Sequence, residues 1–265
     1  MCGTDLDDPL AIVCQVGQAV VYSHRSITGH KTNEDALGVF EWGDGKLLLA
    51  IADGVGGLPG GAAAARRVLE TLHKPPAGEH EDPIVYLLDK ANDSIRQDIS
   101  TGATTLSAVL IQNKRFTGYH AGDSTTLVVG QRGRVKFQSV CHSPVGVAQA
   151  RGELSERAAL FHPQRHLLSN MLGDEAFWVE RSDCYELATF DTIVIASDGL
   201  WDNFFCDEII DIVCQGTLVQ AGRRLAHSAR RRMLTVEDNV PSKPDDLSFV
   251  LYRRQNARDT SDSTL

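Results

Sequence analysis

LLLAIADG, at residues 47–54, and TIVIASDG, at residues 192–199, are two apolar runs that each end in Asp-Gly. Each run is only a few residues long, and each is rich in aliphatic side chains. Turn-forming residues come directly after each run. A short apolar run bounded in this way is typical of a buried β-strand that ends in a tight turn. The two segments therefore predict two core strands, each closed by an aspartate.

Helices and strands come in blocks around these two runs. Residues 60–73 predict a helix, and residues 81–99 repeat their apolar side chains at steps of three and four, which predicts a second helix. Residues 104–140 consist of β-rich runs separated by turn residues, which predicts an antiparallel meander. Two more helices and a last strand are predicted at 207–213, 218–233 and 247–253. Blocks of this kind favour an α+β fold with antiparallel sheets and helices on their outer faces.

The length of 265 residues is compatible with one domain. We expect residues 17–253 to form that domain, residues 1–16 to be an N-terminal extension of uncertain structure, and residues 254–265 to be a polar tail. Between the blocks, residues 141–180 carry the weakest pattern, with a short helix near 153–160. We expect a mobile flap there.

Composition narrows the classes of function. The chain has 26 basic and 35 acidic residues, a formal charge of −9, which argues against binding to nucleic acid or an anionic membrane. No apolar run approaches the roughly 20 residues of a spanning helix, and the first residues do not resemble a signal peptide. The six cysteines show no paired spacing, so we expect them to be reduced. A cytoplasmic protein is predicted.

Acidic residues recur at the ends of the predicted strands. Asp53 and Asp198 each close a strand, Asp123 lies in a turn between two strands, Asp245 precedes the last strand, and Asp35 precedes residues 47–52. Because the end of one antiparallel strand lies beside the start of the next, these acids can converge on one rim. Any one Asp-Gly pair taken alone is better explained as an ordinary turn. The joint occurrence of acids at several strand ends favours one shared binding site.

Carboxylates that converge repel one another unless a cation neutralises them. A set of oxygen ligands without paired cysteine or histidine suits Mg²⁺ or Mn²⁺ better than Zn²⁺. Two such ions can activate water and neutralise a phosphoryl group, so the predicted chemistry is phosphoester hydrolysis. His162 and His166 have the spacing of a zinc pair on a helix, but Pro163 lies between them and we expect surface histidines. The sequence has neither the GxSxG motif of a serine hydrolase nor a nucleotide-binding loop.

Six short segments together resemble those of a known family. They are NEDA (33–36), ADGVGG (52–57), GATTL (102–106), AGDS (121–124), ASDGLWD (196–202) and DDLSFVL (245–251). They occur in the order found in the PPM (PP2C-like) phosphatases of bacterial type, and the resemblance runs from about residue 20 to residue 253. It implies an α-β-β-α sandwich, in which two antiparallel sheets are flanked by helices and the metals lie at one end between the sheets.

The resemblance also implies roles for individual residues. Asp53 would bridge two core ions, Mn²⁺ or Mg²⁺, and Gly54 would bind one of them through its carbonyl. Asp198 and Asp245 would hold the other ion. Asp35 would act nearby, partly through water. Asp53, Asp198 and Asp35 are thus the predicted catalytic residues.

The resemblance also implies roles for two more acids, and the sequence departs from the family at one position. Asp123 matches the aspartate of a weaker third metal site, which it would share with Asp198. Asp246 falls where the family often has asparagine and is expected to be a supporting acid. An arginine that binds phosphate in many relatives is replaced here by His30, next to Lys31, so we assign phosphate binding to these two residues.

The activity that this resemblance implies is hydrolysis of phosphoserine and phosphothreonine on proteins. The partners would be a phosphorylated protein and an opposing kinase, and we expect a monomer. Two alternatives stay open: a non-catalytic phosphoprotein-binding regulator on the same fold, motivated by His30, and a phosphoesterase that acts on small molecules.

Overall fold

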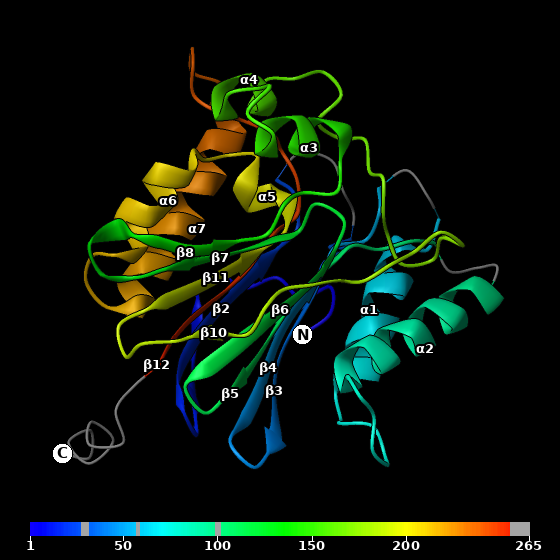
Figure 1. Cartoon of the computed structure of the whole chain (residues 1–265). Coiled ribbons are helices and arrows are strands. Elements are labelled where there is room, and N and C mark those ends of the chain that lie inside the picture. The colour runs from blue at the N-terminus through cyan, green and yellow to red at the C-terminus, as the bar shows by residue number, and fades with distance from the viewer. Residues whose placement is uncertain (28–31, 57–58, 99–101, 255–265) are drawn as a thin grey trace.

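Two antiparallel β-sheets pack face to face, with helices on both outer sides (Figure 1). The computed structural model describes residues 1–27, 32–56, 59–98 and 102–254. The first sheet has the order β1 (Leu10–Cys14), β2 (Gly17–His24), β12 (Leu247–Arg254), β11 (Thr192–Ala196), β7 (Thr125–Val129) and β8 (Val135–Gln138). The second has the order β10 (Tyr185–Glu186), β6 (Arg115–Ala121), β5 (Leu106–Gln112), β4 (Lys46–Ala52) and β3 (Ala36–Gly43), and β9 (Glu180–Arg181) also pairs with β6. The predicted α+β sandwich is confirmed.

The helices fall into three groups (Figure 1). Helices α1 (Gly61–Leu72) and α2 (Pro83–Gln97) cover the second sheet, and α6 (Cys206–Val213) and α7 (Leu218–Leu234) cover the first. Three short helices, α3 (Pro144–Ala150), α4 (Glu156–Leu160) and α5 (Asp198–Trp201), lie together at one end of the sandwich, and a 3-10 turn at Gln131–Gly133 joins β7 to β8. None of the helices described has the length and apolar character needed to span a membrane.

The apolar runs of β4 and β11 are continuous because both faces of these strands are buried. In β4, Leu48 and Ala50 pack toward α1 and α2, whereas Leu49 and Ile51 pack between the two sheets. Successive side chains of a strand point to opposite faces, so a strand covered on both sides needs apolar residues at every position. The same alternation in β11 sends every second side chain into the layer between the sheets.

Helix α2 begins where the sequence provides a cap. The Asp82 carboxylate accepts hydrogen bonds from the backbone amides of Ile84 (3.0 Å) and Val85 (3.2 Å), and Pro83 occupies the first helical position. These contacts satisfy amide groups that have no partner inside the helix. The helix predicted at residues 81–99 is therefore present, slightly shorter than expected.

The predicted meander over residues 104–140 is wrong in one respect. Strands β5 and β6 pair with each other in the second sheet, but β7 and β8 belong to the first sheet. The chain crosses between the sheets at residues 122–124, where Gly122 has a φ of 104° and a Cβ would lie 2.7 Å from the Thr105 side chain. Local strand patterns do not distinguish a hairpin from such a crossing.

The N-terminal residues form part of the sandwich, in contrast to the extension predicted for 1–16. Strand β1 pairs with β2 along its whole length. The Met1 amino group donates to the carbonyl of Leu37 (2.6 Å), and the Leu37 amide donates to the Met1 carbonyl (2.8 Å). At the other end, β12 continues to Arg254, and the rest of the predicted tail lies outside the described residues.

The segment between β8 and β11 contains more helix than predicted. Besides α4, which matches the short helix expected near 153–160, it contains α3. Ser143 caps α3 by accepting a hydrogen bond from the Gly146 amide (2.9 Å), and Pro144 occupies the first turn. The mobility expected for this flap remains a prediction.

Candidate metal site

The ends of three strands in the first sheet place acidic residues side by side. Ala196, the last residue of β11, pairs with Thr125 at the start of β7 and with Phe249 near the start of β12. Asp198 follows β11 by two residues, and Asp123 precedes β7 by two. Asp245 similarly lies two residues before β12. The antiparallel register thus brings all three acids to one end of the sheet.

The second sheet contributes two more acids at the same end. Ala52, the last residue of β4, pairs with Ala36, the first residue of β3. Asp53 and Asp35 are the next residues outward on the two strands. The Ser197 hydroxyl, from the first sheet, donates a hydrogen bond to Asp35 Oδ2 (2.9 Å), which links the two sheets at this rim.

The five acids lie close enough for their charges to influence one another. Burial raises the pKa of Asp53 well above its usual value, and the charges of four neighbours raise it further: Asp35, Asp198, Asp123 and Asp245. Carboxylates influence one another in this way only at short range through a water-poor interior. Residues that are up to about two hundred positions apart in sequence therefore form one cluster.

Two of the other acids show the same effect. Burial, followed by the charge of Asp198, raises the pKa of Asp123 to about 8 and that of Asp245 to about 6. Both groups would take up protons near neutral pH if no cation neutralised the cluster. A cation bound among these carboxylates would therefore stabilise their ionised forms.

Asp35 is nearly inaccessible to solvent, with 1% of its surface exposed. Its Oδ1 atom has no hydrogen-bond donor among the residues that the structure describes. Burial raises the pKa of Asp35 well above its usual value, and the charge of Asp246 adds to the effect. A buried carboxylate oxygen without a donor is costly unless a ligand meets it.

Asp246 supports the segment that carries Asp35. Its Oδ1 accepts a hydrogen bond from the Ser26 amide (2.6 Å), and its Oδ2 accepts one from the Glu34 amide (2.6 Å). The two carboxylate oxygens thus tie the end of β2 and the segment before β3 to the start of β12. This contact agrees with the supporting role expected for Asp246.

The glycines of the two Asp-Gly turns allow backbone segments to approach closely. A Cβ on Gly54 would lie 2.5 Å from the Gly61 carbonyl carbon, and a Cβ on Gly199 would lie 1.9 Å from the Asp246 backbone oxygen. A side chain at Gly54 would push this turn away from the start of α1, and one at Gly199 would push that turn away from the Asp245–Asp246 segment. Packing therefore requires these glycines, in addition to any role of the Gly54 carbonyl toward a metal.

The donor set fits a hard divalent cation. Every acid named here offers carboxylate oxygen, and the cluster contains a buried oxygen without a donor and raised carboxyl pKa values. Mg²⁺ and Mn²⁺ bind through oxygen ligands, and a divalent charge would reverse the repulsion among these groups. The residues present therefore fit such ions.

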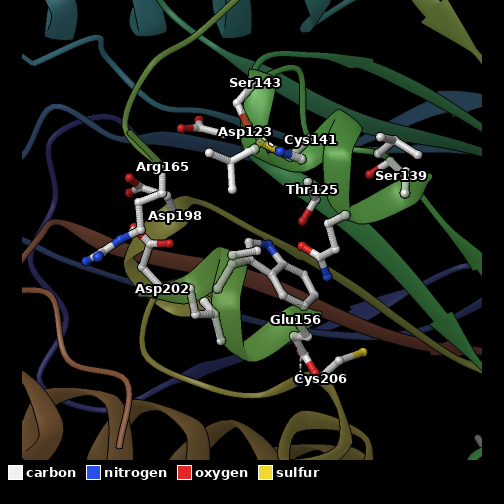
Figure 2. Close-up of a pocket in the computed structure, with 18 of the residues that line it drawn as sticks. Asp123, Thr125, Ser139, Cys141, Ser143, Glu156, Arg165, Asp198, Asp202 and Cys206 are labelled. Atoms are coloured by element: carbon white, nitrogen blue, oxygen red, sulfur yellow. Dashed lines mark hydrogen bonds and ion pairs between the residues drawn. The ribbon is translucent and has the colours of Figure 1, made fainter. Parts of the chain in front are cut away.

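A cavity of about 380 Å³ lies beside the acids. Figure 2 shows Arg165, Asp198 and Asp202 gathered on one side of it, with Glu156 and Cys206 at the other end. Its remaining walls include apolar side chains from the short helices, Val145, Ala159 and Trp201, and from Phe204, which lies between α5 and α6. Two of the five acids, Asp123 and Asp198, thus line a partly apolar hollow beside α3 and α4.

A family model described as protein phosphatase 2C matches residues 23–235. That span is well over half of the chain. The chain belongs to the protein phosphatase 2C family. The family predicted from the six motifs is confirmed.

Curated relatives carry consistent names. The serine/threonine phosphatase stp of Listeria welshimeri is 26% identical over 246 residues, which cover 86% of this chain and 94% of that protein. The serine/threonine protein phosphatase PstP of Mycobacterium tuberculosis is 28% identical over 224 residues, which cover 79% of this chain and 42% of PstP. With the family match, these relatives confirm the predicted enzyme class, a serine/threonine protein phosphatase.

Solved structures share the fold of this phosphatase. Stp1 of Staphylococcus aureus has a TM-score of 0.76 at 22% identity, covering 96% of this chain and all of that one. PstP of M. tuberculosis has a TM-score of 0.75 at 23% identity, covering 91% of this chain and all of that one. Another structure holds the PstP catalytic domain in complex with two manganese ions, with a TM-score of 0.70 at 23% identity; the match covers 91% of this chain and 99% of that one.

The structure does not test the predicted phosphate ligands of this phosphatase. His30 and Lys31 lie outside the described residues, so their assignment stays a prediction. His162 and His166 are described, and the Nδ1 atom of His162 accepts a hydrogen bond from the Gln164 amide (3.1 Å).

Three residues of the site were not predicted. Asp202 accepts ion pairs from Arg165 (3.3 Å) and from Lys243 (3.1 Å), and burial, followed by the charge of Asp198, raises its pKa. Asp202 lies in the ASDGLWD motif, four residues after Asp198, and the α5 turn brings both to the same side. For Arg165 and Lys243 the sequence offered no comparable signal.

A second group of metal-ligating residue types, His120, His142 and Glu180, lies beneath the Asp123 turn. His142 Nδ1 accepts a hydrogen bond from the Asn170 amide group (2.8 Å), and His142 Nε2 lies 2.8 Å from Glu180 Oε2. An imidazole that accepts at Nδ1 carries its proton on Nε2, where it donates to the carboxylate and leaves no lone pair for a metal. His142 is therefore a hydrogen-bonded brace of the turn.

Proposed function

We propose that this phosphatase hydrolyses phosphoserine and phosphothreonine on proteins at the acidic rim between its two sheets. Two divalent cations would be held by Asp53, the Gly54 carbonyl, Asp198 and Asp245, with Asp35 close by. The observation that supports this proposal is the mutual influence of these carboxylates on the pKa of Asp53. A weaker third ion would be held by Asp123 together with Asp198.

The bound cations would supply an activated water and neutralise charge on the phosphoryl group. The chain's own residues would hold the geometry. Ser197 orients Asp35 through its hydroxyl, which leaves Asp35 Oδ1 available to accept a hydrogen bond from water or substrate. Asp246 fixes the segment before β3 through two backbone amides.

The cavity beside the acids suits a side chain presented on a protein. Its apolar wall from α3, α4 and α5 can pack against a peptide, while its acidic end lies beside the proposed metal ligands. His30 and Lys31 are the proposed phosphate ligands. We further propose a cytoplasmic monomer that opposes a protein kinase and uses Mn²⁺ or Mg²⁺.

The test is release of phosphate from a phosphothreonine peptide in the presence and absence of Mn²⁺. Asp53→Ala and Asp198→Ala should each abolish turnover, whereas Asp93→Ala, at an exposed position on α2, should leave it unchanged. Activity that survives both site substitutions would reject the assignment.

The same assay separates the two alternatives. A non-catalytic regulator would bind Mn²⁺ and phosphopeptide without releasing phosphate. A small-molecule phosphoesterase would prefer a small phosphate ester to the phosphopeptide at equal concentration.

A further inference from the structure

An ammonium group lies among the acids proposed to bind metal. Lys243 Nζ contacts Asp245 Oδ2 (3.0 Å), Asp202 Oδ2 (3.1 Å) and, at closer range, Asp198 Oδ2. Its side chain is 22% exposed, so water screens these contacts only in part. One lysine thus bridges three carboxylates, two of which are proposed ligands of the same ion.

The position of Lys243 is set by its backbone. The Asn203 side chain accepts a hydrogen bond from the Lys243 amide (2.9 Å) and donates one to the Lys243 carbonyl (2.9 Å). The same Asn203 amide group donates to the Gly199 carbonyl (2.9 Å), and Asn203 is fully buried. Pro244 follows and restricts the backbone further. The turn that carries Asp198 therefore also holds the lysine in place.

We propose that Lys243 is a built-in counter-ion that competes with the divalent cation for Asp198 and Asp245, so that metal loading requires displacement of its ammonium group. This inference rests on the proposed function, because it takes these two acids as metal ligands. A metal ion bound at about 2.1 Å from the same oxygens would lie within a few ångströms of the ammonium. Two cations at that separation repel strongly in a partly buried site, so both cannot keep these contacts.

Removal of the lysine charge should therefore have two opposite effects. The metal-free protein loses its counter-ion, so its acids repel one another and its thermal stability falls. The metal ion loses a competitor, so its affinity rises. A lysine that only supported the fold would give the first effect without the second.

The experiment uses the full chain stripped with chelator and titrated with Mn²⁺ by isothermal calorimetry. Lys243→Met should lower the Kd for Mn²⁺ by about tenfold, and its melting temperature in chelator should fall by about 3 °C. Lys243→Arg, which keeps the charge, should stay close to the parent in both measurements. The matched control Lys114→Met, at an exposed turn between β5 and β6, should change neither.

The outcomes are distinguishable. An unchanged or raised Kd in folded Lys243→Met would overturn the role of Lys243, while Mn²⁺ binding that is lost in Asp53→Ala would still support the proposed metal site. If Lys243→Met does not fold, Lys243→Gln provides the neutral variant for the same comparison. A parent chain that takes up no Mn²⁺ would overturn both proposals.

Discussion

Replacement of Asp246 by asparagine tests how the chain holds Asp35 in the site. Asp246 uses one carboxylate oxygen for the Ser26 amide and the other for the Glu34 amide, both at 2.6 Å, and it is 4% exposed. Asparagine offers a single acceptor oxygen, and its amide group would face one of the two donors. One short hydrogen bond to a charged group is lost, and a buried amide is left without a partner.

The expected cost follows from these contacts. A hydrogen bond to a charged group contributes about 1.5–3 kcal/mol. Loss of the Asp246 charge offsets part of this cost, since that charge raises the pKa of the buried Asp35. We expect a net loss of about 2 kcal/mol in the free energy of unfolding when Mn²⁺ neutralises the cluster, and a smaller loss in chelator.

The measurement is urea unfolding of Asp246→Asn with Mn²⁺ and with chelator, next to Asp93→Asn as the exposed control. The control should stay within about 0.5 kcal/mol of the parent. Equal stability of Asp246→Asn and the parent in Mn²⁺ would refute the reasoning, and would mean that asparagine, which the family often has there, holds both amides.

Two further predictions concern the metal-free site and the Asp-Gly turns. In chelator, the free energy of unfolding should fall as pH rises from about 4 to about 8. The native state keeps protons on Asp123 (pKa about 8) and Asp245 (pKa about 6) in this range, whereas the unfolded chain, with a carboxyl pKa of 3.8, has already lost them. Thermal melts across this range should show the decline in chelator and a weaker one in Mn²⁺; a flat profile in chelator would contradict it. Gly199→Ala should cost about 3 kcal/mol in urea unfolding, because its Cβ would lie 1.9 Å from the Asp246 oxygen, whereas Gly56→Ala, which meets nothing within 4 Å, should be nearly neutral. Similar stabilities for these two variants would show that the turn relaxes at little cost.

The strands that end in Asp53 and Asp198 could be predicted because their sequence pattern is local. β4 and β11 are buried on both faces, so every residue after the first one of each strand is apolar, and each run stands out against its turn. β2 and β3 were not predicted, although they complete the core, because glycine, polar and charged residues interrupt their apolar pattern. Strand β1 has mostly exposed or half-buried residues, so nothing in its pattern indicated pairing.

Some residues of the candidate site could be predicted from the sequence for a related reason. Asp53, Asp198, Asp123, Asp245 and Asp35 lie at strand ends, and antiparallel pairing determines that such ends meet. Lys243 and Arg165 lie in irregular segments before β12 and after α4, where no periodicity relates sequence to position. Their contacts with the acids arise only from the tertiary path of those segments.

The charge balance at the rim links stability to function in this phosphatase. Burial and mutual repulsion raise the pKa of four of the clustered acids, which costs the metal-free protein stability. The same cost becomes binding energy for a divalent cation, since the ion relieves all of these repulsions at once. Lys243 relieves some of them beforehand, so it makes the metal-free state more stable at the expense of metal affinity. An acidic site built in this way can fold before its metal arrives, and its affinity for the ion depends on how easily one lysine side chain leaves.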